Sequence, residues 1–207
     1  ERLIALTPKG LDKVFYADNG SAGIEVALKM SHHFWVNQGK PEKKKFISLS
    51  NGYHGETLAT LSVSDVPLYS QTYQALLFDV IKVPSPDCYY REAGQSWEEH
   101  SVLMFQHMQA ALDKHRHEVA AVILEPLVQA AGGMRMYHPV YLTLLAQACK
   151  EAGVHLILDE IAVGFGRTGS MFACEQAGIT PDFLVLSKAL TAGFLPLAAV
   201  LTTNTVY

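Results

Sequence analysis

The sequence has little of what marks secreted, membrane-spanning or nucleic-acid-binding proteins. Its 207 residues include only three cysteines, widely spaced: Cys88, Cys149 and Cys174. An odd number of distant cysteines excludes a disulfide framework and indicates free thiols in a reducing cytoplasm. The apolar run Phe194–Leu201 contains a proline and is far too short to cross a bilayer. No group of His, Cys, Asp and Glu has metal-ligand spacing, so no metal is expected.

Charge is also scarce. The net charge is −4, and the only basic block is Lys43-Lys44-Lys45, which we expect to be a solvated turn because it follows Gly39 and Pro41. Nucleic acid is therefore not an expected partner. With 49% hydrophobic and 17% charged residues, the composition is that of a globular protein with a sizeable core.

Strand-like and helix-like segments alternate along the chain. Short apolar runs predict these strands: Val14–Ala17, Lys45–Leu49, Asp79–Val83, Ala120–Leu124, Val154–Leu158, Phe183–Leu186 and Leu197–Leu201. Helical periodicity is found around Ile24–Trp35, Met104–Leu112 and Pro139–Ala152. This order predicts an α/β fold with a mostly parallel sheet covered by helices on both faces and no internal domain boundary.

Two of these predicted strands end in a charged residue. Val154–Leu158 continues into Asp159, and Phe183–Leu186 continues into Ser187 and Lys188. Ligands bind at the carboxyl ends of parallel strands. We therefore expect this carboxylate and this amine to face one ligand.

Three other strand ends carry residues that suit the same ligand. Asp18-Asn19-Gly20-Ser21 opens a helix, which favours a bound phosphate, although an ordinary helix cap is also consistent with it. Tyr53, flanked by glycines in Asn51–Gly55, can lie flat over a planar ring or form a half-buried turn; His54 beside it is a weak acid–base signal. Glu125 closes a third strand. Together the five strand ends predict pyridoxal phosphate chemistry.

A different hypothesis comes from Gly164-Phe165-Gly166-Arg167-Thr168-Gly169. This segment matches the G-x-G-x-x-G pattern of dinucleotide-binding oxidoreductases, and Asp182 follows it. That motif needs its first glycine directly after a strand and a long helix after it. Here five residues intervene after the strand and only a short helix fits, so we expect a loop.

The sequence resembles the class III, subgroup II aminotransferases over essentially its whole length. The resemblance rests on Asp159-Glu160-Ile161 with the glycine-rich segment that follows, on Ser187–Leu190 and on Asn51–Gly55. It implies the large domain of the fold type I pyridoxal phosphate enzymes. It also implies that Lys188 is the Schiff-base lysine and proton carrier and that Asp159 is the pyridine partner. The other implied site residues are Gly20 and Ser21 for phosphate, Tyr53 and Ile161 for the ring, and Tyr53 and Glu125 for substrate.

A narrower resemblance lies in Glu125–Gln129 and Gly132–Pro139. These stretches look like the branch of the family that acts in biotin synthesis, which implies S-adenosylmethionine as amino donor and 8-amino-7-oxononanoate as acceptor. The chain departs from that branch at Glu56, where Asp is usual, and at Ala130, where Gly is expected. Ornithine, acetylornithine and 4-aminobutyrate aminotransferases share most of these motifs and remain alternatives.

The resemblance also bears on domain organisation. It implies that residues 1–207 are most of the large cofactor domain and that an N-terminal segment and a C-terminal small domain are not included. It further implies a homodimer with the site at the subunit interface. A non-catalytic fragment remains an alternative.

Overall fold

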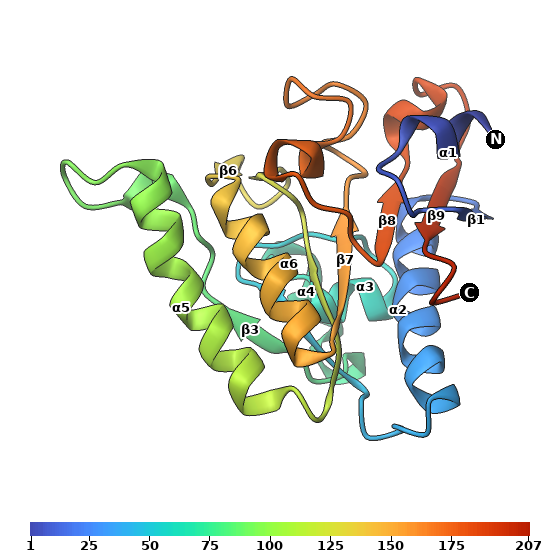
Figure 1. Cartoon of the computed structure of the whole chain (residues 1–207), viewed down its shortest axis with the longest axis horizontal. Coiled ribbons are helices and arrows are strands. Elements are labelled where there is room, and N and C mark those ends of the chain that lie inside the picture. Colours follow the sequence, from blue (N-terminus) through green and yellow to red (C-terminus); the bar gives the residue numbers. More distant parts are fainter.

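The computed structural model describes residues 1–207 and contains a seven-stranded sheet in the order β1-β9-β8-β7-β4-β2-β3. Figure 1 shows this sheet between helices on its two faces. The strands are β1 Lys13–Ala17, β2 Lys45–Leu49, β3 Ile81–Val83, β4 Val119–Leu124, β7 His155–Asp159, β8 Phe183–Leu186 and β9 Ala198–Thr202. All neighbours are parallel except those of β9, which is antiparallel to β1 and β8. The predicted mostly parallel sheet is confirmed.

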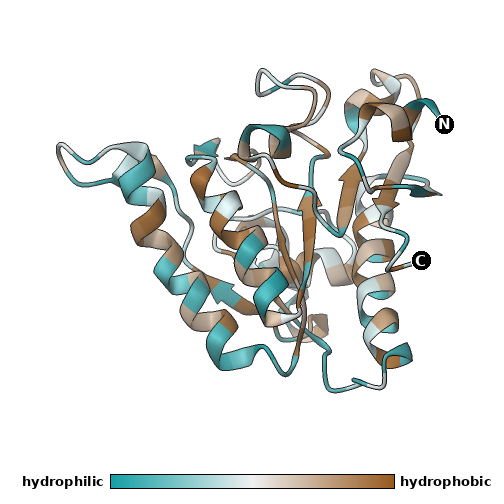
Figure 2. Cartoon of the chain, in the orientation of Figure 1, coloured by the Kyte–Doolittle hydropathy of each residue, from teal (hydrophilic) through white to brown (hydrophobic).

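The helices form two layers around this sheet. They are α1 Arg2–Leu6, α2 Gly20–Asn37, α3 Leu58–Val63, α4 Pro67–Ser70, α5 Trp97–His115 and α6 Val140–Ala152. One apolar core lies between the sheet and α5 and α6, and a second lies between the sheet and α2. Figure 2 shows the central strands as the most hydrophobic part of the chain. None of the helices has the length and apolar composition that crossing a membrane requires.

The long helices begin and end where the sequence provides caps. Ser96 and Glu99 form a capping box at the start of α5. Gly153, with φ 61°, ends α6 in the left-handed conformation that glycine adopts without strain.

Sequence periodicity missed the short elements. These are α1, α3, α4, the 3₁₀ turns η1 Gln71–Leu76, η2 Cys88–Tyr90, η3 Ala173–Ala177 and η4 Lys188–Thr191, and the hairpin β5 Val128–Gln129 with β6 Arg135–Met136. Each spans one or two turns or a two-residue strand, which is too little chain to show a period. The irregular stretch predicted at Pro84–Gln95 is a loop apart from η2.

The expectation that the basic block is fully solvated is wrong for Lys43. Its ammonium is buried and donates to the carbonyls of Arg116, Val119 and Gly153 at 2.6, 3.0 and 3.0 Å. It also lies 4.7 Å from the centre of the Trp35 ring. Three carbonyl acceptors and an aromatic face compensate the cost of burying this cation. No local sequence pattern predicts that set of contacts.

A buried histidine lies at the same end of the sheet and makes folding pH-dependent. Burial, with a smaller effect of Lys43, lowers the pKa of His155 from 6.5 to about 4. Between these two pH values the unfolded chain binds a proton that the folded chain does not. The contribution of His155 to stability is therefore present above pH 6.5 and is lost as the pH falls towards 4, by about 3 kcal/mol in total.

We expect the free energy of unfolding, measured with urea, to fall between pH 6.5 and 4.5, and His155→Gln to reduce that slope. His33→Gln is the matched control, because His33 is exposed. An unchanged slope in His155→Gln would contradict this assignment.

Candidate active site

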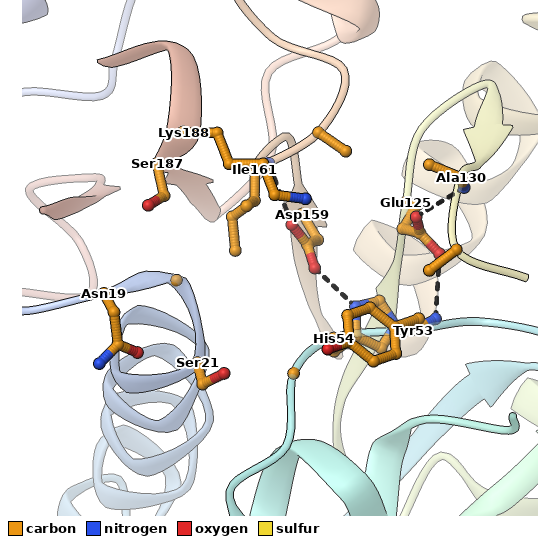
Figure 3. A pocket seen from close by; sticks show the side chains of 14 residues that line it. Asn19, Ser21, Tyr53, His54, Glu125, Ala130, Asp159, Ile161, Ser187 and Lys188 are labelled. Carbon is orange, nitrogen blue, oxygen red and sulfur yellow. Dashed lines mark hydrogen bonds and ion pairs between the residues drawn. The ribbon is translucent and has the colours of Figure 1, made fainter. Parts of the chain in front are cut away.

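A pocket of about 340 Å³ lies at the carboxyl ends of the parallel strands (Figure 3). All the site residues predicted from the sequence line it: Gly20, Ser21, Tyr53, Glu125, Asp159, Ile161 and Lys188. They come from five strand ends, as the alternation of strands and helices predicted.

The amino end of α2 forms one side of the pocket. Asn19 caps this helix, because its side chain accepts from the backbone N–H of Ala22 at 3.0 Å. The N–H groups of Gly20 and Ser21 lie in the first turn and have no partner within the helix. The same helix end can therefore be capped and bind an anion. Asn19 caps the helix, and the N–H groups of Gly20 and Ser21 remain free to donate to the anion.

Gly20 cannot carry a side chain without displacing its neighbour. A Cβ atom there would lie 3.0 Å from Cδ1 of Ile161. Glycine therefore lets the helix end and Ile161 approach each other, which narrows the pocket between them.

Asp159 is buried and held by two donors. Its Oδ2 lies 2.8 Å from Nδ1 of His54, and its Oδ1 accepts from the N–H of Ile161 at 3.0 Å. His54 is also buried, and its Nε2 has no hydrogen-bond partner. Because the carboxylate accepts, Nδ1 of His54 carries the proton that it donates. From the sequence, His54 was only a weak acid–base candidate, because its partner Asp159 lies 105 residues away.

Glu125 joins two loops at the side of the pocket. It is 4% exposed, and its two oxygens accept from the N–H groups of Tyr53 and Ala130 at 3.0 and 2.9 Å. Burial raises the pKa of this carboxyl to about 7, against the lowering effects of His54 and the two N–H groups. Its charge therefore depends on small changes in its surroundings near neutral pH.

Tyr53 stands between Glu125 and two groups that sequence analysis did not place in the site. Its hydroxyl donates to Glu56 at 2.9 Å, and its ring centre lies 5.1 Å from that of Tyr69. Burial, followed by the hydrogen bond to Glu56, raises the pKa of Tyr53 to about 12, so the phenol stays neutral. Tyr69 belongs to the short α4, which had no sequence signal.

Lys188 follows β8 and lies in the left-handed region with φ 41°. Non-glycine residues in this region are strained, and such residues cluster at functional sites. The amine of Lys188 makes no hydrogen bond or ion pair within the chain. It is therefore free to react with a ligand in the pocket, where Figure 3 shows it on the same side as Asp159.

The glycine-rich segment after β7 shapes a loop and begins no helix. The N–H of Gly164 donates to the carbonyl of Glu160, whose buried carboxylate accepts from Ala173 and Cys174 at 2.7 and 2.8 Å. Asp182, the candidate ribose ligand, accepts from the N–H of Leu156 within the fold. The dinucleotide hypothesis therefore lacks both its helix and its acidic residue.

The family model "Aminotransferase class-III" matches residues 1–207. The chain belongs to the class III aminotransferase family. Proteins named adenosylmethionine-8-amino-7-oxononanoate aminotransferase from Geobacter sulfurreducens and Helicobacter pylori are 45% and 50% identical to it, over the whole chain and 46% and 45% of their own lengths. The chain thus spans about half the length of these relatives.

Solved structures of class III transaminases share the fold. The adenosylmethionine-8-amino-7-oxononanoate aminotransferase of Methanocaldococcus jannaschii matches with a TM-score of 0.88 and 40% identity, over 100% of this chain and 45% of that one. An (S)-enantioselective omega-transaminase of Thermomicrobium roseum matches with a TM-score of 0.93 and 32% identity, over 99% and 46%. The predicted fold type I architecture is confirmed.

Class III aminotransferases depend on pyridoxal phosphate, which presents a phosphate, a planar ring, a ring nitrogen and an aldehyde. The pocket fits this group. The N–H groups of Gly20 and Ser21 are free to donate, and a Cβ atom at Gly20 would occupy the space between this helix end and Ile161. A tyrosine ring, a buried carboxylate and an unpaired amine line the same space of about 340 Å³.

Proposed function

We propose that residues 1–207 form most of the cofactor-binding large domain of a pyridoxal-phosphate-dependent aminotransferase. One observation carries this proposal: Lys188, Asp159, Tyr53 and the amino end of α2 line a single pocket, although they are spread over most of the chain. An N-terminal segment and a C-terminal small domain would complete the enzyme.

Each residue of the pocket suits one part of the cofactor. Gly20 and Ser21 would bind the phosphate through their free N–H groups and the positive end of α2. Tyr53 and Ile161 would cover the two faces of the ring. Asp159, oriented by His54, would accept from the ring nitrogen and keep it protonated.

When bound, the cofactor supplies an aldehyde that takes up an amino group and a ring that withdraws electrons. The chain's own residues would do the rest. Nζ of Lys188 would hold the cofactor and then carry the proton that the substrate carbon loses. Glu125, with a pKa near 7, would adjust its charge to the substrate group that lies beside it.

The proposed phosphate site at the amino end of α2 requires a glycine at position 55. Gly55 has φ 128° and lies in close contact with Ser21. A Cβ atom there would lie 2.8 Å from Cβ of Ser21. We expect Gly55→Ala to lower the free energy of unfolding by about 2–4 kcal/mol, from backbone strain and overpacking, and to weaken cofactor binding.

Gly10→Ala is the matched control for this prediction. Gly10 has φ 101°, but a Cβ atom there would meet nothing within 4 Å. It should cost only the strain of about 1–2 kcal/mol and leave cofactor affinity unchanged. Equal cofactor affinities of the two variants, measured by titration with pyridoxal phosphate, would contradict the role of Gly55.

For the substrates we propose S-adenosylmethionine as amino donor and 8-amino-7-oxononanoate as acceptor. The proposal is supported by the names of the relatives at 39–50% identity and by the stretch Gly132–Pro139. Another class III ω-aminotransferase is the second candidate, because omega-transaminases are among the structures that match this fold.

We also propose a homodimer with the site at its interface, and a cytoplasmic location. The class III family implies the dimer. The location is supported by the three thiols, all of which are free and buried.

A donor screen tests the substrate proposal. The holoenzyme is assayed with S-adenosylmethionine, lysine, ornithine and 4-aminobutyrate, each with 8-amino-7-oxononanoate as acceptor. We expect product with S-adenosylmethionine. Activity only with a small ω-amino acid and 2-oxoglutarate would overturn the substrates and leave the cofactor chemistry standing.

A further inference from the structure

A partly buried lysine on the edge strand β3 does not line the pocket but is linked to it by hydrogen bonds. Lys82 pairs in register with Ser48 of β2. Its ammonium donates to Oγ of Ser48 and to the carbonyls of Ser62 and Ser64, at 2.9, 3.1 and 2.7 Å. These three acceptors match the three N–H groups of an ammonium, so the cation is fully satisfied within the chain.

The two carbonyls belong to the end of α3, whose last residue is Val63 and whose C-cap is Ser64. The last carbonyls of a helix have no partner within the helix. A lysine side chain can accept this role by donating to them. Lys82 therefore fixes the end of α3 relative to β2 and β3.

The cation does more at this place than an apolar side chain would. Asp65 and Asp79 line the same hollow of about 260 Å³ as Lys82, yet neither forms an ion pair with it. Burial lowers the pKa of Lys82 to about 8, and Asp65 opposes this shift only in part. Taking a cation out of water costs free energy, which an apolar side chain would avoid. What the lysine adds is a set of directed hydrogen bonds to the helix end.

The residues at this helix end bind the loop that follows β2. Oγ of Ser64 accepts from the N–H of His54 at 2.8 Å, and the carboxylate of Asp65 accepts from the N–H of Asn51 at 3.1 Å. The N–H of Asp65 donates to the carbonyl of Gly52 at 2.8 Å. Three hydrogen bonds therefore join the backbone of this loop to the end of α3.

The same loop carries two residues of the pocket, Tyr53 and His54. The ring of His54 contacts the carboxylate of Asp159 at 2.8 Å, and its backbone N–H is held by Ser64. An unbroken series of contacts therefore leads from Lys82, through these two residues, to Asp159. Since Lys82 does not line the pocket, an effect of its charge on the reaction has to pass along this series.

We propose that Lys82 is a positioning residue of the reaction: it fixes the end of α3 and thereby the loop that presents His54 to Asp159. The inference rests on the proposed function and deepens it, because it names a residue outside the pocket that sets the geometry of the pyridine partner.

Hydrogen–deuterium exchange tests the link between Lys82 and the loop without any reaction. Lys82→Met keeps an unbranched side chain and removes the charge and the three donors. It should speed the exchange of the N–H groups of Asn51 and His54 by about 10-fold and leave exchange in α6 unchanged. Unchanged exchange in the loop would overturn the proposal.

The donor half-reaction tests whether this link affects the site. Lys82→Met should slow the single-turnover rate by about 3- to 10-fold and leave KM for the donor unchanged. It should also alter the pH dependence of the bound cofactor's absorbance, as His54→Gln should. In the His54→Gln background it should slow the reaction little further, because both substitutions act through Asp159. A full rate with an unchanged absorbance profile would show that Lys82 serves stability alone, which contradicts the proposal.

Ser64→Ala tests the second step of the same link. It removes the hydroxyl that accepts from His54 and keeps the carbonyl that binds Lys82, so it should slow the half-reaction as Lys82→Met does. A full rate in Ser64→Ala overturns the proposal even if Lys82→Met proves unstable. Lys45→Met is the matched control, because Lys45 begins β2, at the end away from the loop, and pairs with Glu118 at 2.9 Å. It should react as the unchanged protein does.

The exchange measurement separates this inference from the proposed function. If the unsubstituted enzyme transaminates no donor, the proposed function fails, while exchange in Lys82→Met still decides whether Lys82 holds the loop. If the enzyme is active and the rates of Lys82→Met and Ser64→Ala are unchanged, only the positioning role fails.

Discussion

Replacement of Lys188 by alanine should abolish transamination, with a rate loss on the order of 10⁴-fold or more. Lys188 is the only lysine that lines the pocket, and no hydrogen bond or ion pair ties its amine to the protein. No neighbouring side chain can therefore take over both the attachment of the cofactor and the proton transfer. The measurement is the single-turnover rate with the amino donor.

Three further measurements show that the loss comes from the missing amine. Lys188→Ala should still bind pyridoxamine phosphate, because the N–H groups of Gly20 and Ser21 are unchanged. Lys29→Ala, at an exposed position on α2, should keep full activity. After borohydride reduction of the holoenzyme, peptide mass spectrometry should find the pyridoxyl group on Lys188. An unmodified Lys188 in the cofactor-loaded protein would contradict its assignment as the residue that attaches the cofactor.

The convergence of the site could be predicted because it depends on strand ends. A parallel α/β sheet brings the carboxyl ends of its strands to one edge, so Asp159 and Lys188 could be placed together from two apolar runs. The same logic placed Gly20, Tyr53 and Glu125 in the pocket. Short apolar runs for the strands and a period of 3.6 residues for the helices were enough to place these strand ends.

The partners of these residues could not be predicted in the same way. His54 meets Asp159 across 105 residues, and Lys43 finds acceptors 73 to 110 residues away. Such contacts depend on the packing of separate loops, and a single sequence carries no signal for them.

Asp159 and Glu160 show what the fold adds to a sequence motif. Both are buried carboxylates next to each other, and composition does not distinguish them. Successive side chains along an extended backbone point in opposite directions, so Asp159 turns to the pocket and Glu160 turns to the start of η3. Asp159 meets His54, while Glu160 holds the N–H groups of Ala173 and Cys174. The first is thus available to a ligand and the second fixes a loop.

Asp159→Asn is the second substitution with a large expected effect. It keeps the size of the side chain and the acceptor for the N–H of Ile161, but it removes the negative charge and replaces the oxygen that accepts from His54 with an NH2 group. Loss of one partner of a buried charge pair costs about 3–5 kcal/mol, which corresponds to about 10²- to 10⁴-fold in rate. Single-turnover kinetics with the donor should show this loss, while the free energy of unfolding without cofactor should change much less.

The role of His54 can be tested in the same experiment. Because Nδ1 of His54 contacts Oδ2 of Asp159 at 2.8 Å, His54→Gln should slow the half-reaction by about 10-fold and alter the pH dependence of the bound cofactor's absorbance. If His54 acts by orienting the carboxylate of Asp159, His54→Gln should slow the half-reaction little further when Asp159→Asn is already present. The effects of the two substitutions on the rate should therefore not add. Full additivity in the double variant would show that His54 serves only the packing of its loop and does not position Asp159.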